Sequence, residues 1–240
     1  KPGYDPLAQA SSGIMSVTGE ENRPPVRVGV SIVDMGSGMW TVIGLLAALY
    51  ERQRTGNGAR VATSLFETGL AWMTIPLAAH AVSGEVRKPH GSGLAEIVPY
   101  QAFEAKDGWV MIAAGNDKLF GKLCEALPGL KQLGKDPRFA RNRDRVERRG
   151  ELLPQIEAAV KKMTVAEVGE ALDAVQVPNC PLLQIDQVWR HPQTEAVGIL
   201  VKSDDQKWVG LPFTLDDERP TSGGTSPALG ASNEALRQQY

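Results

Sequence analysis

Cysteine and histidine are scarce in this chain, which has 2 Cys and 3 His among 240 residues. Cys124 and Cys180 lie far apart and show neither metal-ligand spacing nor a disulfide framework. We therefore expect a reducing compartment and a cytoplasmic protein. The histidines, His80, His90 and His191, have no second ligand at helical or turn spacing, which argues against a metal site. No phosphate-binding glycine loop or nucleophile elbow is present, and no permanently bound cofactor is expected.

An excess of charge of either sign is also lacking, since the chain has 26 Lys and Arg residues and 28 Asp and Glu residues. Such a balance gives no long-range field to attract phosphate backbones, so we expect no nucleic-acid partner. The arginine-rich segment 135–149 is interleaved with acids and is typical of a solvated helix face laced with ion pairs. Nucleic-acid binding by this segment is the lesser alternative.

Long hydrophobic runs are absent as well. The longest strongly apolar stretch, Val42–Tyr50, is well short of the roughly 20 residues that a spanning helix needs. The first residues show no signal-peptide pattern. These two observations predict no membrane association.

The first part of the chain has the pattern of an α/β layer. Residues 4–20 predict a helix broken by Ser and Gly, and residues 35–54 predict a helix that is apolar nearly all round, as if packed between layers. Arg60–Leu65 alternates like a strand, and a second apolar helix is predicted at 67–82. Strand and helix in this order favour an α/β fold.

The remainder of the chain predicts smaller elements. Residues 83–94 resemble a linker, and strands at 98–104 and 109–114 should pair in antiparallel fashion across an Asp-Gly turn. Asn116 or Asp117 should cap a helix that has Cys124 on its apolar face. Further helices are predicted at 151–163 and, behind a capping box, at 164–174, with late strands at 199–201 and 208–209.

Asp34 is the most unusual placement, because it closes an apolar run and heads an apolar helix. It could be an ordinary N-cap, which is a favoured role for Asp. Gly36 and Gly38 follow closely, however, and would let a ligand approach the backbone. A helix N-terminus also stabilises negative charge. These features fit a nucleophilic carboxylate placed against an acyl group.

A family resemblance rests on longer segments. The chain contains GYDPLAQASSGIMSVTGE, then PPVRVGVSIVDMGSGMWTVIGLLAALYERQRTGNGARVATSLFETGLAWM, and later IVPYQAFEAKDGWVMIAAGNDKLFGKLCEAL, VPNCPL, HPQTEAVGI and PALGASNEAL. Together they resemble the class III CoA-transferases, the group of formyl-CoA, carnitine and bile-acid-inducible CoA-transferases. The match is carried by the Tyr-Asp pair, the Ala-Gln that follows it, the Asp-x-x-x-Gly at a helix start and the R-T-G-x-G turn, and it covers nearly the whole chain.

The resemblance implies roles for particular residues. Asp34 matches the family's catalytic aspartate, which forms a mixed anhydride with the acyl group and then an aspartyl-CoA thioester. CoA thereby moves from an acyl-CoA to a carboxylic acid. Tyr4 and Asp5 match a Tyr-acid pair that lines the site, although a half-buried aromatic at a helix start explains Tyr4 as well. A glycine-rich lid has its counterpart at Gly91 and Gly93, which an ordinary linker also explains.

The resemblance also implies an architecture. The family has a Rossmann-like large α/β domain with an inserted small α+β domain and forms interlocked homodimers. The large domain would occupy residues 1–83 and 191–240, and the small domain residues 84–190. In the family a further segment precedes Tyr4 and supplies the first strands and much of the CoA pocket. We therefore expect this chain to be a fragment of a longer polypeptide or to need a separate chain.

Two alternatives stay open at this point. The same fold includes α-methylacyl-CoA racemases, which need an acid-base pair at the α-carbon. In those relatives a His stands at the position of Tyr4, whereas tyrosine, with a pKa of about 10, is a poor base at neutral pH. A Glu that orients this His lies near Asp117, which is more simply a helix cap here. The other alternative is a truncated, non-catalytic relative that binds acyl-CoA or only dimerises.

Overall fold

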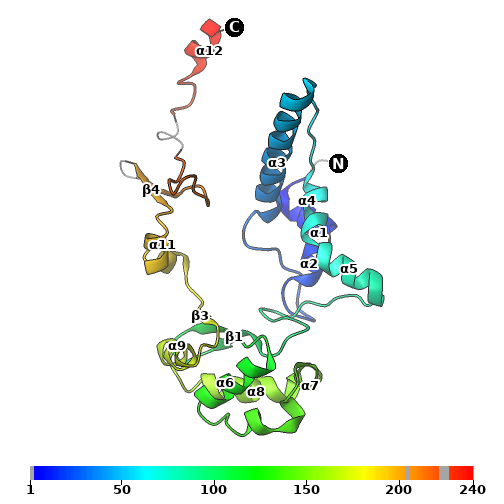
Figure 1. Cartoon of the computed structure of the whole chain (residues 1–240), viewed down its shortest axis with the longest axis vertical. Helices are drawn as coiled ribbons and strands as arrows, with labels where there is room; N and C mark the ends of the chain where they lie inside the picture. The colour runs from blue at the N-terminus through cyan, green and yellow to red at the C-terminus, as the bar shows by residue number, and fades with distance from the viewer. Residues whose placement is uncertain (1–2, 204–205, 222–226, 240) are drawn as a thin grey trace. The chain divides into compact units, whose positions relative to one another are not determined.

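The computed structural model describes residues 3–203, 206–221 and 227–239 (Figure 1). Contacts divide the chain into two compact units, Lys1–Leu182 and Leu183–Tyr240. The first unit contains two separate hydrophobic cores, one around the start of the chain and one around a small sheet. The fold is mixed α/β, and the sheets found in the described residues are small and antiparallel. The expected Rossmann-like layer stays a prediction.

The first core lies among helices at the start of the chain. They are α1 (Asp5–Ser11), α2 (Ile14–Val17), α3 (Ile32–Thr55), α4 (Leu65–Trp72) and α5 (Thr74–Ser83). Gly13 breaks α1 from α2 with a φ of 91°, which confirms the predicted broken helix. Helix α3 ends at Gly56, which has the left-handed conformation typical of a C-terminal glycine. The predicted apolar helix at 67–82 is present but is divided at Met73.

The predicted strand at Arg60–Leu65 is wrong. Residues 57–64 have no regular structure, and Ser64 caps the N-terminus of α4 by accepting a hydrogen bond from the backbone N–H of Glu67. Within the described residues no neighbouring strand pairs with this segment, so its alternating pattern has no sheet to join. Val61 instead packs against Gly44 of α3, where a Cβ would lie 2.7 Å from a Val61 methyl group.

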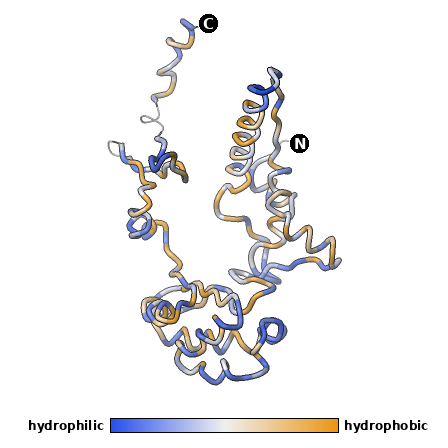
Figure 2. Tube along the Cα trace, in the orientation of Figure 1, coloured by the Kyte–Doolittle hydropathy of each residue, from blue (hydrophilic) through white to orange (hydrophobic). Residues whose placement is uncertain are grey.

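Helix α3 is less buried in this chain than its sequence suggests. Of its residues, Val33 and Gly36 are buried, while the large apolar side chains of its later turns are exposed. Figure 2 shows the hydrophobic residues along this helix in orange. Length and composition alone would allow this helix to cross a membrane, a test that core helices of soluble proteins also pass. The expectation that no run is long enough was therefore wrong by this measure, because α3 has no charged residue between Asp34 and Glu51.

The second core surrounds a three-stranded sheet of order β1-β2-β3. Its strands are β1 (Tyr100–Glu104), β2 (Trp109–Ala113) and β3 (Asn179–Pro181). The predicted hairpin is confirmed, with Tyr100 opposite Ala113. Around it lie α6 (Asp117–Ala126), α7 (Asn142–Glu147), α8 (Arg149–Val160) and α9 (Val165–Ala174), with short 3₁₀ turns at Leu133–Lys135 and Pro137–Phe139. Cys124 is buried in this core, as predicted, and the capping box of α9 is present.

Two charged residues in this region differ from their predicted roles. The predicted cap at Asn116 or Asp117 is confirmed for Asn116, whose side chain accepts a hydrogen bond from the N–H of Leu119 at 2.9 Å, and the interpretation of Asp117 as the cap is wrong. Asp117 instead accepts from Arg145 at 2.8 Å. Arg145 lies in the charged segment expected to be a solvated face, yet its side chain is 0% exposed. It donates to the carbonyls of Val98 and Phe139 and stacks over Phe120.

The second unit is built from short elements. They are α10 (Ile185–Val188), α11 (Pro192–Ala196), β4 (Leu200–Ser203), β5 (Gln206–Val209) and α12 (Asn233–Gln239). Strands β4 and β5 form an antiparallel pair in which Val201 lies opposite Trp208. The two late strands are therefore present where the sequence predicts them.

Candidate active site

Asp34 is the third residue of α3, and its side chain is exposed. Ser31 occupies the N-cap position but makes no side-chain capping hydrogen bond. The interpretation of Asp34 as the N-cap is therefore wrong. Within the described residues its carboxylate takes part in no hydrogen bond or ion pair, so it is free to meet a reactant.

Asp5 does the capping that Ser31 does not. Its carboxylate, from α1, accepts the backbone N–H of Val33 at 2.8 Å and that of Asp34 at 3.2 Å. Asp5 is only 3% exposed, and its other oxygen accepts from the side chain of Gln9. Two of the free amides at the start of α3 are thus satisfied by a residue from another helix.

The electrostatics of Asp5 follow from these contacts. Burial by itself would raise the pKa of this carboxyl group. The hydrogen bonds from Gln9 and from the amides of Asp34 and Val33, with the nearby charge of Arg27, outweigh burial and hold the pKa below its ordinary value. Asp5 is therefore a fixed negative charge against the first turn of α3. The family resemblance implies that Asp5 lines the substrate site, and that direct role stays a prediction.

Gln9 continues the network to the loop before α3. It is 0% exposed, and its side-chain carbonyl accepts the backbone N–H of Val28 at 2.9 Å. Arg27 donates to the carbonyls of Val28 and Gly29, each at 3.1 Å. Gln9 belongs to the Ala-Gln pair that carries part of the family resemblance, but no role was predicted for it, although its spacing of four residues from Asp5 on a helix is a usable signal.

The first amides of α3 are already engaged. Ile32 donates to the carbonyl of Val30 at 2.8 Å, and Val33 and Asp34 donate to Asp5. These three amides are therefore not available as donors to developing negative charge. The helix dipole still acts at this end, but an oxyanion needs donors from elsewhere.

Tyr4 precedes α1 and is 79% exposed. The alternative interpretation as a half-buried aromatic is therefore wrong. Its backbone carbonyl accepts from Leu7 and Ala8, each at 3.0 Å, which fixes its main chain at the start of α1. Because the next residue, Asp5, bonds the amide of Asp34, the main chain of Tyr4 lies close to the start of α3.

The two glycines after Asp34 have different surroundings. Gly36 is buried, and a Cβ there would lie 2.9 Å from a Thr68 carbon and 3.0 Å from the Trp72 ring. Gly38 is exposed, with nothing within 4 Å of such a Cβ. Gly36 therefore allows α3 and α4 to approach closely, whereas Gly38 leaves open space beside the helix. Their predicted contact with substrate stays a prediction.

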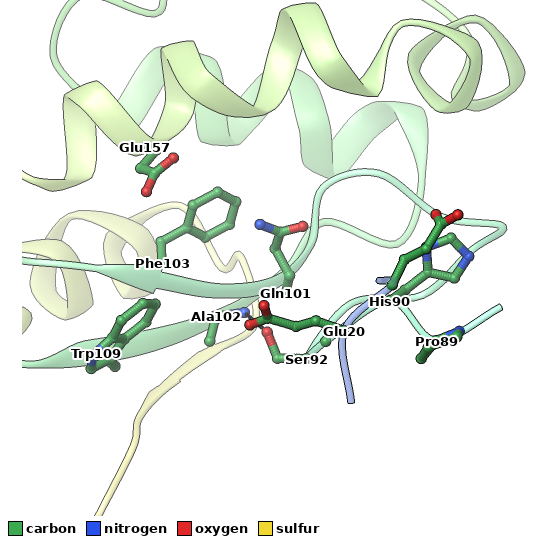
Figure 3. Close-up of a pocket in the computed structure, with 11 residues that line it drawn as sticks. Glu20, Pro89, His90, Ser92, Gln101, Ala102, Phe103, Trp109 and Glu157 are labelled. Carbon is green, nitrogen blue, oxygen red and sulfur yellow. Dashed lines mark hydrogen bonds between the residues drawn. The ribbon is translucent and has the colours of Figure 1, made fainter. Parts of the chain in front are cut away.

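Gly91 and Gly93 lie in a turn beside a cavity that does not include Asp34. Gly91 has a φ of 62° and donates to the carbonyl of Gly19 at 2.6 Å, while Gly93 donates to that of His90. A cavity of about 390 Å³ lies beside this turn, with Ser92, Gln101 and Trp109 among its lining residues (Figure 3). Asp34 is not among its lining residues. The lid role of these glycines stays a prediction.

Two contacts hold the same turn against residues 20–21. Lys88 pairs with Glu21 at 2.6 Å, and His90 forms an isolated bridge with Glu20. The pKa of His90 is lowered by burial and by the charges of Arg149 and Arg87. Among the residues that the structure describes, no group of His, Cys, Asp and Glu could hold a metal ion.

Comparisons with known proteins now identify the family. The chain matches CoA-transferase family III over residues 1–233. It belongs to this family. The acetyl-CoA:oxalate CoA-transferase of Acetobacter aceti is 35% identical over 243 residues, which cover all of this chain and 62% of that protein. The mouse succinyl-CoA:glutarate CoA-transferase is 32% identical, and the match covers 84% of this chain and 46% of that protein.

A solved structure supports the same assignment. A CaiB/BaiF family protein from Brucella suis has a TM-score of 0.87 and 32% identity, covering 100% of this chain and 63% of that chain. The chain thus spans less than two thirds of the length of the relatives that it matches. The fold around Asp34 and Asp5 is that of a family III chain.

Proposed function

We propose that the protein transfers CoA from an acyl-CoA donor to a carboxylic acid acceptor, with Asp34 as the nucleophile. The observation that carries the proposal is the free, exposed carboxylate of Asp34 in the first turn of α3, in a chain of CoA-transferase family III. A nucleophile must be exposed to its substrate and must not be consumed by structural hydrogen bonds.

The reaction would run in four substitutions at acyl carbons. A carboxylate oxygen of Asp34 attacks the thioester carbonyl, the C–S bond breaks, and CoA leaves as thiolate from a mixed anhydride. The thiolate then attacks the aspartyl carbonyl, which releases the donor acid and leaves an aspartyl-CoA thioester. The acceptor carboxylate then attacks the carbonyl of this thioester, and CoA leaves again as thiolate. The thiolate attacks the acyl carbon of the acceptor, which gives the new acyl-CoA and regenerates Asp34. No net proton or electron transfer is needed.

The surroundings of Asp34 suit this chemistry. The positive end of the α3 dipole favours the carboxylate and the negative charge that develops at the acyl group. Tyr4, exposed beside Asp5, supplies a phenol that can donate a hydrogen bond to an acyl or anhydride oxygen. Gly38 leaves room on the exposed side of α3 for the acyl portion of the substrate.

Transfer is favoured over racemisation by two residues. Tyr4 stands where the racemases have His, and its phenol is a poor base at neutral pH. Asp117 is bound to Arg145 at 2.8 Å rather than being available to orient a histidine. The names of the relatives, acetyl-CoA:oxalate and succinyl-CoA:glutarate CoA-transferase, suggest short dicarboxylic acids as the first acceptors to test.

The proposal includes an interlocked homodimer. It is supported by family membership and by the exposed apolar side chains of α3, a surface that water solvates poorly. Light scattering of the purified protein distinguishes a dimer of this kind from a monomer.

The deciding experiment is to incubate the full-length protein with succinyl-CoA and search for a CoA adduct by mass spectrometry. We expect the adduct on the peptide that contains Asp34, and none in the Asp34→Ala and Asp34→Asn variants. These variants should also fail to form oxalyl-CoA or glutaryl-CoA from the free acids. Normal transfer by either variant would exclude Asp34 as the nucleophile. Absence of transfer by the unmodified protein across a panel of donors and acids would favour the non-catalytic alternative.

A further inference from the structure

A buried chain of hydrogen bonds joins the loop before α3 to the residue proposed as nucleophile. It runs from the N–H of Val28 to the side-chain carbonyl of Gln9, from the Gln9 amide to Asp5, and from Asp5 to the amides of Val33 and Asp34. Gln9 and Asp5 are 0% and 3% exposed. The side chains of Gln9 and Asp5 are therefore shielded from water, while the two ends of the chain, at Val28 and Asp34, are part-buried.

Each group in this chain has a fixed polarity. Asp5 is an acceptor on both oxygens, so it can receive the Gln9 amide on one and the two backbone amides on the other. Gln9 must donate toward Asp5 and accept from Val28, which fixes the orientation of its side chain. The amide group of Asp34 is thereby tied to a carboxylate on α1, a helix that is itself packed against α4 by way of Gly69 and Ser12.

We propose that Asp5 and Gln9 are positioning residues that fix the first turn of α3, and with it the carboxylate of Asp34, in the geometry required for attack. The inference rests on the proposed function of Asp34. It differs from the substrate-lining role that the resemblance implies for Asp5, because the contacts of Asp5 are with the main chain of α3. Displacement of a nucleophile by about 1 Å costs on the order of 100-fold in rate, which sets the size of the expected effect.

Polarity exchange tests this inference. In Asp5→Asn the new side-chain NH₂ meets the NH₂ of Gln9, and in Gln9→Glu two carboxylates face each other. The double variant, Asp5→Asn with Gln9→Glu, restores the order of donors and acceptors. Its side-chain amide at position 5 can accept the α3 amides through oxygen and donate through nitrogen to the carboxylate at position 9, which still accepts from Val28. One negative charge is kept, but it lies at position 9 and no longer contacts the first turn of α3.

The measurements use the full-length protein. For each single variant we expect kcat to fall about 100-fold, with the KM for acyl-CoA changed less than about threefold, and faster amide hydrogen exchange at the start of α3. The double variant should recover most of kcat and the slow exchange. Ser37→Ala is the matched control. It removes two 2.8 Å hydrogen bonds, from Ser37 to Thr68 on α4 and to the backbone carbonyl of Val33, and it keeps every hydrogen bond from Gln9 to the amides of Val33 and Asp34.

Three results would overturn the inference. Single variants with normal kcat would show that the network does not position Asp34. A double variant that regains slow exchange and thermal stability but not kcat would show that the Asp5 carboxylate acts on the reactants itself. If Ser37→Ala lost as much kcat as the network variants for the same fall in Tm, the role of Asp5 and Gln9 would be merely structural. Transfer activity in Asp34→Asn would instead contradict the proposed function, and the exchange measurement would still test the geometry.

Discussion

The carboxylate of Asp5 accepts the backbone N–H of Asp34 at 3.2 Å, so a buried acid on α1 caps the helix that presents an exposed acid. The two carboxylates have opposite surroundings although the two residues are joined by one hydrogen bond. Asp5 is enclosed by donors, whereas the side chain of Asp34 faces solvent. The first is suited to holding structure and the second to meeting a substrate.

Removal of the Asp5 carboxylate should destabilise the protein. In Asp5→Ala the amides of Val33 and Asp34 and the side chain of Gln9 lose their acceptor, and unsatisfied buried groups cost about 1 to 3 kcal/mol each to leave unpaired. Because solvent can reach part of the site, we expect a total loss of about 2 to 4 kcal/mol in urea denaturation. Glu157→Ala, at an exposed carboxylate on α8, is the control and should change stability by less than about 0.5 kcal/mol. Equal stability of the two variants would contradict the capping role.

The stabilisation by Asp5 should depend on pH. Since its pKa in the folded protein lies below the ordinary value of 3.8, the folded state binds fewer protons than the unfolded state between the two pKa values. The contribution of Asp5 is therefore fully present above about pH 5 and is lost as the pH falls through the lowered pKa. The difference in unfolding free energy between the unmodified protein and Asp5→Asn should be constant from about pH 5 to 7 and smaller at about pH 3. A difference that grows on acidification would contradict this assignment.

Gly36 and Gly38 offer a matched pair of substitutions on α3. Gly36→Ala places a methyl group 2.9 Å from Thr68 and 3.0 Å from the Trp72 ring, so α3 and α4 must move apart. Such overpacking typically costs about 1 to 3 kcal/mol. Gly38→Ala meets nothing within 4 Å and should stabilise the helix by about 0.5 to 1 kcal/mol, because alanine is the better helix former. Thermal unfolding measures both, and the opposite order of stabilities would show that the α3–α4 contact is not as described.

Arg145 should be the most sensitive charge in the second core. Its guanidinium donates to three backbone carbonyls and to Asp117, and all of these groups lose a donor in Arg145→Ala. The side chain of Asp117 is 47% exposed, so the cost comes mainly from the carbonyls left without a donor, at about 1 to 3 kcal/mol for each buried group. Arg145→Lys should recover little, because an ammonium group cannot reproduce the planar fork of donors.

The control for Arg145 is a nearby exposed arginine. Arg143 is on the same helix, with a side chain that is 83% exposed. Arg143→Ala should change the free energy of unfolding by less than about 0.5 kcal/mol. If Arg145→Ala were equally mild in chemical denaturation, the buried network would not be a determinant of stability.

Racemase activity should be absent. A racemase would exchange the α-proton of a 2-methylacyl-CoA for deuterium in heavy water, which proton NMR detects. Because Tyr4 is a poor base at neutral pH, we expect no exchange above the uncatalysed rate under conditions in which CoA transfer is measured. Exchange that is abolished in Asp34→Asn would instead establish the racemase alternative.

Much of the fold could be predicted from the sequence where local signals are strong. The Asp-Gly turn between β1 and β2, the capping box at Thr164 and the glycine stop after α3 all depend on neighbouring residues, and all three are present. The strand predicted at Arg60–Leu65 failed for the opposite reason. Alternation of side chains is a property of the segment, but a strand exists only where another backbone offers hydrogen bonds.

The sequence by itself determined the family, the position of Asp34 at the start of an apolar helix and the burial of Cys124. Only the tertiary structure decided that Asp5 caps α3, that Gln9 completes the buried network and that Arg145 is enclosed rather than solvated. Those contacts join residues that lie as much as 47 positions apart, and whether a polar side chain is buried depends on which elements close around it. Local patterns determine where the proposed nucleophile lies in the chain, whereas tertiary packing determines which groups contact the helix that carries it.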